Sequence, residues 1–319
     1  MKVVIQVPCF NEAENLGAVL EDLPRSIPGV DAIEILVIDD GSTDGTADVA
    51  RAHGAPHVIR HARNRGLAAA FAHGLQASLE SGADVIVNTD GDHQYRGEDI
   101  PRLVQPILNG QADMVVGDRQ VKSIPHFSRV KKWLQKTGSL VVRWASRTSV
   151  PDATSGFRAF SREAALRLEI FSTYTYTLET LIQAGRKGMT VISVPVTTNP
   201  IRRRSRLVRS VPGYVARSAV TILRVFLMYE ALRVFLILGA IPLLAGLLLL
   251  GRFVYFYLIG DGTGHVQSLI VAAILVVLGI QAFLLGLLGD LIAKNRHLSE
   301  ETNYRLKRMT LAKDLRKEP

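Results

Sequence analysis

The chain has 319 residues, 48% of them hydrophobic and one of them a cysteine, and its 38 Lys and Arg against 29 Asp and Glu give a formal charge of +9. This composition excludes a disordered chain, a small disulfide-stabilised fold and a fibrous protein. A charge of +9 makes nucleic-acid binding the first hypothesis, and the position of the basic residues along the chain tests it.

Short runs rich in Val and Ile alternate with segments of helical period through residues 1–200. The runs predict buried strands, and the segments between them predict helices that cover both faces of a mostly parallel sheet. We expect strands at 3–7, 35–38, 85–87, 114–116 and 191–196. We expect helices at 15–23, 43–53, 67–79 and 100–108, with Asn11 and Ser42 at the starts of the first two.

Acidic residues follow four of the expected strands: Glu12, Asp39, Asp40, Asp90, Asp92 and Asp118. In a parallel sheet ligands bind beyond the carboxyl ends of the strands, so these side chains converge on one edge. Asp90 and Asp92 are two residues apart on an extended chain and point the same way. Clustered carboxylates are tolerable around a cation, and oxygen ligands suit Mg²⁺ or Mn²⁺, which also binds substrate phosphates.

Other nucleotide-binding patterns are absent from the sequence. There is no Gly-x-x-x-x-Gly-Lys-Ser/Thr, and no Gly-x-Gly-x-x-Gly follows the first expected strand, so neither a P-loop nor a dinucleotide fingerprint is predicted. The single cysteine, Cys9, cannot form an intrachain disulfide, which fits a reducing cytosol. The chain begins directly with a strand-like run, so a secretory leader is not expected.

All of the excess positive charge lies in two stretches. Residues 120–150 and 201–229 each carry seven Lys or Arg and no acid, and without these 14 the chain has 24 basic and 29 acidic residues, a charge of −5. Large apolar residues, including Trp133 and Trp144, alternate with the basic ones. This mixture is typical of helices that lie in an anionic membrane surface, although two amphipathic helices packed on a core would also fit. Nucleic acid is therefore not an expected partner.

Two uncharged runs near the C-terminus are long enough to cross a membrane: 234–250, of 17 residues, and 266–289, of 24. Arg252 is the one Lys or Arg between them, whereas eight follow Asp290. The positive-inside rule then places both termini and the N-terminal domain in the cytoplasm. We expect spans at 231–260 and 265–290 and a cytosolic basic tail at 291–319; a buried hairpin of a soluble protein is the alternative.

With these residues assembled, the chain resembles the family 2 glycosyltransferases of the A-type (GT-A) fold, and within them the dolichyl- or polyprenyl-phosphate sugar transferases. The motifs match specifically over residues 1–120 and moderately over 150–210. For the hairpin, the resemblance lies only in the arrangement of two membrane helices after the catalytic domain. The matching motifs are Val7-Pro8-Cys9-Phe10-Asn11-Glu12, Asp39-Asp40-Gly41-Ser42-x-Asp44-Gly45-Thr46, Asp90-x-Asp92-x-Gln94, Gly117-Asp118-Arg119, Asp152-x-x-Ser155-Gly156-Phe157-Arg158 and Ser205-Arg206-Leu207.

The resemblance implies an α/β, Rossmann-like GT-A domain over 1–200, which includes a basic interface segment at 120–150. A basic juxtamembrane segment follows at 201–230, and we expect both basic segments to form amphipathic helices at the membrane interface. A two-helix transmembrane hairpin comes next. It also implies roles for single residues. The nucleotide-sugar would be held by Pro8, Phe10, Glu12, Val37, Asp39, Asp40, Asp90, Gly91, Asp92 and Arg119. The metal ligands would be Asp90, Asp92 and Gln94, and Asp90, Asp92 and Arg119 would be catalytic. The acceptor phosphate would meet Ser155, Arg158, Arg202, Ser205 and Arg206.

Two positions depart from the family pattern. Arg206 replaces the usual Lys and keeps its charge with a different geometry. Pro200 stands where the family has an arginine, so Arg202, Arg203 or Arg204 must substitute for it.

The implied activity is that of a membrane-bound inverting glycosyltransferase, which moves a sugar from a nucleotide-sugar to dolichyl or polyprenyl phosphate for glycan synthesis. GDP-mannose is the favoured donor, and glucose, galactose or N-acetylglucosamine from UDP-sugars remain open. A phosphate acceptor, with a second pKa of about 6, is already ionised at neutral pH and needs no strong general base. The alternatives are an anchored transferase with a saccharide or protein acceptor and a catalytically silent nucleotide-binding scaffold. Anionic membrane lipids are expected partners, and the sequence predicts no oligomeric state.

Overall fold

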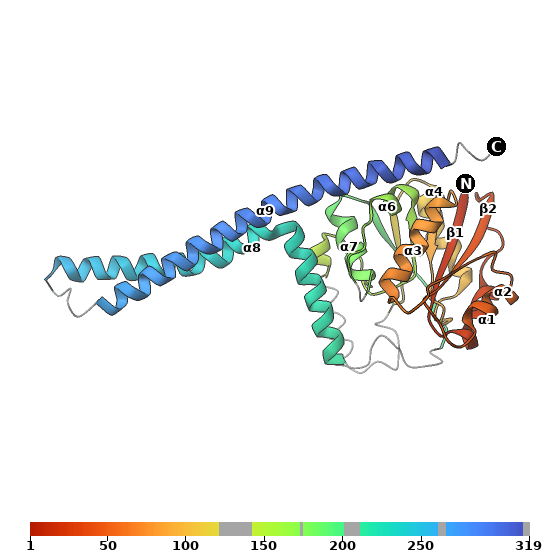
Figure 1. Cartoon of the computed structure of the whole chain (residues 1–319), viewed down its shortest axis with the longest axis horizontal. Helices are drawn as coiled ribbons and strands as arrows, with labels where there is room; N and C mark the ends of the chain where they lie inside the picture. Colours follow the sequence, from red (N-terminus) through yellow and green to blue (C-terminus); the bar gives the residue numbers. More distant parts are fainter. Residues whose placement is uncertain (121–141, 173–174, 201–210, 261–265, 315–319) are drawn as a thin grey trace. The chain divides into compact units, whose positions relative to one another are not determined.

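The computed structural model describes the chain except for residues 121–141, 173–174, 201–210, 261–265 and 315–319 (Figure 1). The chain divides into two compact units. The first contains Met1–Ile222 and Thr302–Pro319, and the second contains Leu223–Glu301.

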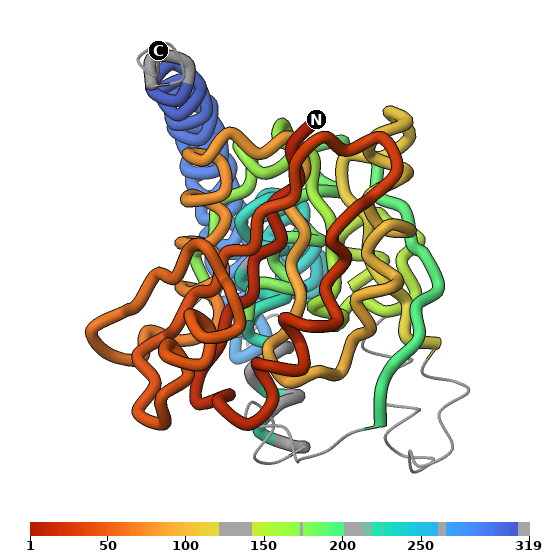
Figure 2. Tube along the Cα trace, turned by 90° about the vertical axis from the view of Figure 1, so that its right-hand side faces the viewer, coloured from red at the N-terminus to blue at the C-terminus, as the bar shows by residue number. Residues whose placement is uncertain are grey.

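The first unit is built on a seven-stranded sheet with the order β3-β2-β1-β4-β6-β5-β7 (Figure 2). The strands are β1 Lys2–Cys9, β2 Ala32–Asp39, β3 His57–Arg60, β4 Val85–Asn88, β5 Met114–Asp118, β6 Arg158–Ser161 and β7 Val191–Pro195. Each pairs in parallel except β6, which runs antiparallel to both β4 and β5. The prediction of a mostly parallel α/β sheet is confirmed.

Helices cover both faces of this sheet (Figure 1). They are α1 Ala13–Asp22, α2 Thr46–Ala52, α3 Leu67–Glu80, α4 Ile100–Leu108, α6 Arg162–Arg167 and α7 Thr177–Arg186, with a 3₁₀ turn, η1, at Gly97–Asp99. On one face, Ile5 of β1 packs in a single core with Leu16 of α1 and Leu103 of α4. Burying apolar side chains on both faces explains the continuous Val and Ile runs.

Two short strands were not predicted. β3 has four residues, the first and last of which are exposed, and β6 begins with an arginine. Neither therefore shows the apolar run that marks the central strands.

The predicted helix starts at Asn11 and Ser42 are wrong. α1 begins at Ala13 and α2 at Thr46, and neither helix has a side-chain cap at its own N-cap residue. Instead the Asn11 amide donates to Ser42 Oγ at 2.8 Å, and the Thr43 amide donates to Asn11 Oδ1 at 2.9 Å. These hydrogen bonds join the loop after β1 to the loop after β2. The two loops are therefore held next to each other at the same edge of the sheet.

The C-terminal segment packs on the first unit. Tyr304, 8% exposed, donates from its hydroxyl to Glu163 Oε1 at 2.9 Å, and the Arg167 guanidinium lies 4.5 Å from the centre of its ring. Lys307 Nζ lies 2.8 Å from Glu169 Oε1. The described residues that follow Thr302 are thus part of the packed structure around α6.

Two long helices, α8 Val211–Leu258 and α9 Val266–Asp314, supply the second unit. Within them Phe226–Leu258 and Val266–Leu311 are long and apolar enough to span a membrane, and the most apolar stretches of 18 residues have mean hydropathies of 2.6 and 2.7. Their most apolar windows are only 11% and 17% buried, unlike the core helices of a soluble protein.

Small residues let the two helices approach closely. A Cβ on Gly239 would lie 2.9 Å from the Cβ of Ala282, and one on Gly279 would lie 2.7 Å from the Cβ of Leu243. Contacts of this kind are typical of helix pairs in membranes, and they support a hairpin. α8 is kinked at Glu230, where φ is −133° and ψ is 29°.

Candidate active site

The carboxyl ends of β1, β2, β4 and β5 share one edge of the sheet, opposite the end of β1 at which Figure 1 marks the N-terminus. β6 adds the loop that precedes it, because an antiparallel strand enters the sheet where its parallel neighbours leave it. Its first residue, Arg158, pairs with Asn88, the last residue of β4. The predicted donor-side and acceptor-side motifs therefore meet at one edge.

Asp90 and Asp92 lie in the loop after β4, and both side chains are partly buried. Asp92 Oδ1 accepts a hydrogen bond from the Gln94 amide at 3.1 Å. No donor in the described part of the chain bonds to the carboxylate of Asp90.

Burial raises the pKa of Asp90 to about 7, and the charge of Asp92 adds to the increase, while nearby Arg119 lowers it. Burial raises the pKa of Asp92 as well. Burial disfavours the charged form of each carboxylate, and the neighbouring negative charge adds to this effect at Asp90. A divalent cation fits this pair, since it would satisfy the oxygens of Asp90 and stabilise both ionised forms.

The cation would need ligands from outside the protein. Within the described ranges no three His, Cys, Asp or Glu side chains form a group that could hold a metal ion. Two carboxylates completed by water and phosphate oxygens are the usual environment of Mg²⁺.

Asp39 lies at the end of β2 and is fully buried. Its Oδ1 accepts from the Ser42 amide at 2.8 Å, and its Oδ2 lies 3.2 Å from Nε of Arg60. Nη2 of Arg60 also donates to the Ser42 carbonyl at 3.0 Å. Phe10, from the loop after β1, is 37% exposed and presents its ring at the surface, as a group that stacks on a nucleobase must. Arg60 was missed in the sequence because it ends β3, which was not predicted.

Asp40 is directed to other partners. Its two oxygens accept from the amides of Arg65 and Gly66 at 2.9 and 2.8 Å, and Oδ1 lies 2.7 Å from Nδ1 of His61. The side chain is 3% exposed. Asp40 thus fixes the loop that leads into α3, and this loop packs against the turn after β2: Gly41 has φ of +75°, and a Cβ there would lie 2.5 Å from the Arg63 carbonyl carbon.

Other residues of the predicted nucleotide set are buried. Val37 and Pro8 lie inside paired strands with buried side chains, and Gly91 packs against Cys9. Glu12, 7% exposed, accepts from the side chain of Asn15 at 3.2 Å. These residues lie beneath the surface at this edge of the sheet and support the loops above them.

Arg119 joins the end of β5 to the acceptor-side loop. Its Nε and Nη2 donate to the two oxygens of Asp152 at 2.7 and 2.9 Å, and Nη2 also donates to Thr154 Oγ1 at 2.8 Å. Burial by itself would raise the pKa of Asp152, but Arg119 outweighs burial and holds this pKa below its usual value.

Arg158 is fully buried behind this loop. Its guanidinium donates to the carbonyls of Ser155, Thr177 and Ala153 and to the hydroxyl of Thr180, at 2.7 to 2.8 Å. Burial lowers its pKa to about 10. In this conformation Arg158 supports the loop from within and does not reach a phosphate.

Ser155 is also buried, with its Oγ 3.5 Å from the hydroxyl of Tyr95. The other predicted acceptor-phosphate residues, Arg202, Ser205 and Arg206, lie outside the described residues, as does most of the 120–150 segment.

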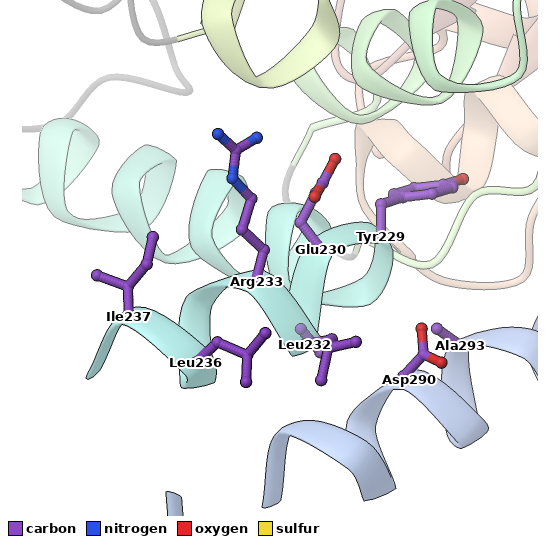
Figure 3. Close-up of a pocket in the computed structure, with 9 residues that line it drawn as sticks. Tyr229, Glu230, Leu232, Arg233, Leu236, Ile237, Asp290 and Ala293 are labelled. Carbon is purple, nitrogen blue, oxygen red and sulfur yellow. The ribbon is translucent and has the colours of Figure 1, made fainter. Parts of the chain in front are cut away.

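The hairpin unit has a cavity of its own, of about 420 Å³ (Figure 3). It adjoins the kink of α8 at Glu230, and its lining includes Arg233 and Leu236 of α8 and Asp290 of α9. These charged groups stand at the boundary of the two uncharged runs. None of the sheet-edge residues lines this cavity.

The sheet with its acidic edge and one antiparallel strand is the architecture of a GT-A glycosyltransferase. The chain belongs to glycosyl transferase family 2, whose sequence model matches residues 4–168. The predicted family, fold class and glycosyltransferase activity are confirmed.

Curated relatives share most of their length with this chain. An undecaprenyl-phosphate mannosyltransferase of Micrococcus luteus is 31% identical over an alignment of 207 residues that covers 62% of this chain and 83% of that protein. A polyprenol monophosphomannose synthase of Mycolicibacterium smegmatis is 30% identical over 211 residues, 61% of this chain and 77% of that protein.

A solved structure shares the fold. Glucosyl-3-phosphoglycerate synthase of Mycobacterium tuberculosis, in complex with Mn²⁺, UDP-glucose and phosphoglyceric acid, matches with a TM-score of 0.57 and 22% identity. The match covers 70% of this chain and 79% of that one.

Proposed function

We propose that this chain is a membrane-bound, inverting glycosyltransferase that moves a sugar from a nucleoside diphosphate to dolichyl or polyprenyl phosphate. One observation carries the proposal. Asp90, whose carboxylate has no donor in the described chain, and Arg119 meet at one sheet edge of a protein with two helices apolar enough to span a bilayer. The names of the two relatives, a mannosyltransferase acting on undecaprenyl phosphate and a polyprenol monophosphomannose synthase, support the lipid phosphate as acceptor and mannose as the sugar. GDP-mannose is therefore the first donor to test, with UDP-sugars as alternatives.

The donor would lie along the edge formed by the loops after β1, β2 and β4. Phe10 would stack on the base, while Asp39, positioned by Arg60, would accept hydrogen bonds from the nucleoside. Asp90, Asp92 and Gln94 would hold Mg²⁺ or Mn²⁺, which neutralises charge on the nucleoside diphosphate leaving group.

An oxygen of the acceptor phosphate would attack the anomeric carbon as the bond to the nucleoside diphosphate breaks. The products are a sugar–phosphate–lipid and a nucleoside diphosphate, and the configuration is inverted. The acceptor is already ionised, so no residue has to remove a proton. Arg119 and the basic residues Arg202 and Arg206 would bind the two sets of phosphate oxygens, whereas Ser155 is buried and would support the loop beside them.

We place the catalytic domain and both termini in the cytoplasm, with spans at 231–260 and 265–290. The basic segments at 120–150 and 201–230 would contact anionic lipid and hold the domain at the bilayer surface. The distribution of Lys and Arg around the two uncharged runs supports this topology.

The acceptor is tested by measuring nucleoside diphosphate release from GDP-mannose and UDP-sugars with and without undecaprenyl phosphate. Release that rises at least about 100-fold with the lipid supports the proposal. If a soluble saccharide or protein stimulates release of nucleoside diphosphate and the lipid does not, the acceptor is not a lipid phosphate. The hairpin would then serve only as a membrane anchor. Nucleotide binding without release in any mixture would indicate a silent scaffold.

A further inference from the structure

Gly156, in the loop before β6, lies directly against the carboxylate of Asp90. A Cβ built on Gly156 would lie 2.9 Å from each oxygen of Asp90. Side-chain carbons essentially never lie so close to a non-bonded oxygen, so any larger residue here would displace the Asp90 carboxylate. Since no donor in the described chain bonds to Asp90, close packing against Gly156 contributes to the orientation of its carboxylate.

Two tyrosines from different elements hold the backbone of Gly156. Its amide donates to the hydroxyl of Tyr95 at 3.2 Å, and its carbonyl accepts from the hydroxyl of Tyr176 at 3.2 Å. The side-chain amide of Asn88 donates to the same carbonyl at 2.9 Å and to the hydroxyl of Tyr176 at 2.7 Å. Both backbone polar groups of Gly156 are therefore fixed.

The tyrosines are themselves held in place. Tyr95 is 4% exposed and stacks on Phe157, with ring centres 4.8 Å apart. Tyr176 is fully buried and stacks on Phe71 of α3, with ring centres 3.8 Å apart. Through these contacts Gly156 is connected to the loop of Asp90 and Asp92, to α3 and to the start of α7.

We propose that Tyr95 and Tyr176 are positioning residues for the cation site: with Asn88 they hold Gly156 against Asp90, so that the carboxylate keeps the orientation in which it binds the metal. The inference rests on the proposed role of Asp90. In this proposal the two tyrosines are uncharged and do not contact the substrate. They affect the metal indirectly, through their hydrogen bonds to Gly156 and the contact of Gly156 with Asp90. Groups that orient metal ligands from behind typically contribute 10- to 100-fold in metal affinity.

The test is a titration of the full-length protein with Mn²⁺, alone and with GDP or UDP, in which electron paramagnetic resonance measures the unbound ion. Tyr176→Phe removes one hydroxyl and keeps the stacked ring, and Gly156→Ala adds the methyl group that displaces Asp90. We expect each to raise the dissociation constant of Mn²⁺ about 10-fold. Tyr257→Phe, at a 67% exposed ring, and Gly251→Ala, with no atom within 4 Å of its added Cβ, are matched controls and should bind Mn²⁺ as the original protein does.

Thermal unfolding of the metal-free proteins separates positioning from stability. If Tyr176→Phe unfolds at a lower temperature but binds Mn²⁺ as before, the network is only structural and the inference is overturned. If Gly156→Ala does not fold, Tyr176→Phe and Tyr95→Phe decide the question. Failure of the original protein to bind Mn²⁺ in any mixture would instead overturn the cation site of the proposed function.

Discussion

Arg119 and Asp152 form a two-point ion pair, with nitrogen–oxygen distances of 2.7 and 2.9 Å, between the end of β5 and the loop that leads into β6. The pair is nearly enclosed, with side-chain exposures of 17% and 2%. Arg119 is also close enough to Asp90 to lower its pKa. One guanidinium therefore connects the acceptor-side loop with the proposed cation site.

Breaking this pair should destabilise the catalytic unit. In Asp152→Asn the guanidinium of Arg119 remains enclosed without its counter-charge, and we expect a loss of about 3 kcal/mol in the free energy of unfolding. Denaturant titration of the detergent-solubilised protein measures it. Asp48→Asn, at an 80% exposed side chain, is the control, and equal stability of the two variants would contradict the account.

The same pair predicts a dependence on pH. The pKa of Asp152 is lower in the folded chain than in the unfolded one, so the carboxylate stabilises the fold above its unfolded pKa of about 3.9. This contribution is lost as the pH falls from there through the folded pKa. Between about pH 5 and about pH 3 the unfolding temperature of the original protein should fall more steeply than that of Asp152→Asn. Parallel curves would show that the pair contributes nothing.

Asp92→Asn should lower turnover at least about 100-fold, since the cation would lose a charged ligand that stabilises the leaving group. The protein should still fold and insert into membranes, because the carboxylate makes one local hydrogen bond, to Gln94. Initial rates at saturating donor and acceptor measure the change. Near-normal activity would contradict the assignment of Asp92 as a metal ligand.

Arg60→Gln should raise the KM for the nucleotide-sugar about 10-fold, the effect expected when one hydrogen bond to a charged group is lost. Arg60 orients Asp39 and is 54% exposed, so the fold should tolerate the change. Arg51→Gln, at a 57% exposed guanidinium on α2, is the matched control. An unchanged donor KM in Arg60→Gln would remove Asp39 and Arg60 from the proposed donor site.

Gly279→Leu should weaken the hairpin by about 1–3 kcal/mol, because the side chain would be forced into Leu243 of α8. The loss of helical circular dichroism during titration with sodium dodecyl sulfate measures the stability of the helix pair. Gly251→Leu, where an added Cβ meets no atom within 4 Å, should behave like the original protein. If both variants respond alike, the close helix contact is not the source of stability.

The central strands were predictable because each is an apolar run buried on both faces. β3 and β6 were not, because β3 is exposed at both ends and β6 begins with an arginine, so neither has such a run. β6 matters most, since its reversed direction brings the acceptor-side loop to the acidic edge.

Site residues were predictable where the residues that act together are close in sequence, as Asp90 and Asp92 are. Asp39 and Asp40 were both expected to bind nucleotide, but consecutive residues at a strand end point to opposite faces, and Asp40 supports α3 instead. Arg60 and Tyr176 gave no sequence signal, because their partners are distant in the chain and are brought near only by the fold.

The central claim is transfer to a lipid phosphate, and the most direct measurement is mass spectrometry of the lipid product. The full-length protein is mixed with undecaprenyl phosphate, Mg²⁺ or Mn²⁺, and in turn GDP-mannose, UDP-glucose and UDP-N-acetylglucosamine. The account predicts one donor that gives undecaprenyl phosphate heavier by a single hexose or N-acetylhexosamine, with one nucleoside diphosphate released per product. Consumption of donor without any glycosylated lipid, in every mixture, would contradict it.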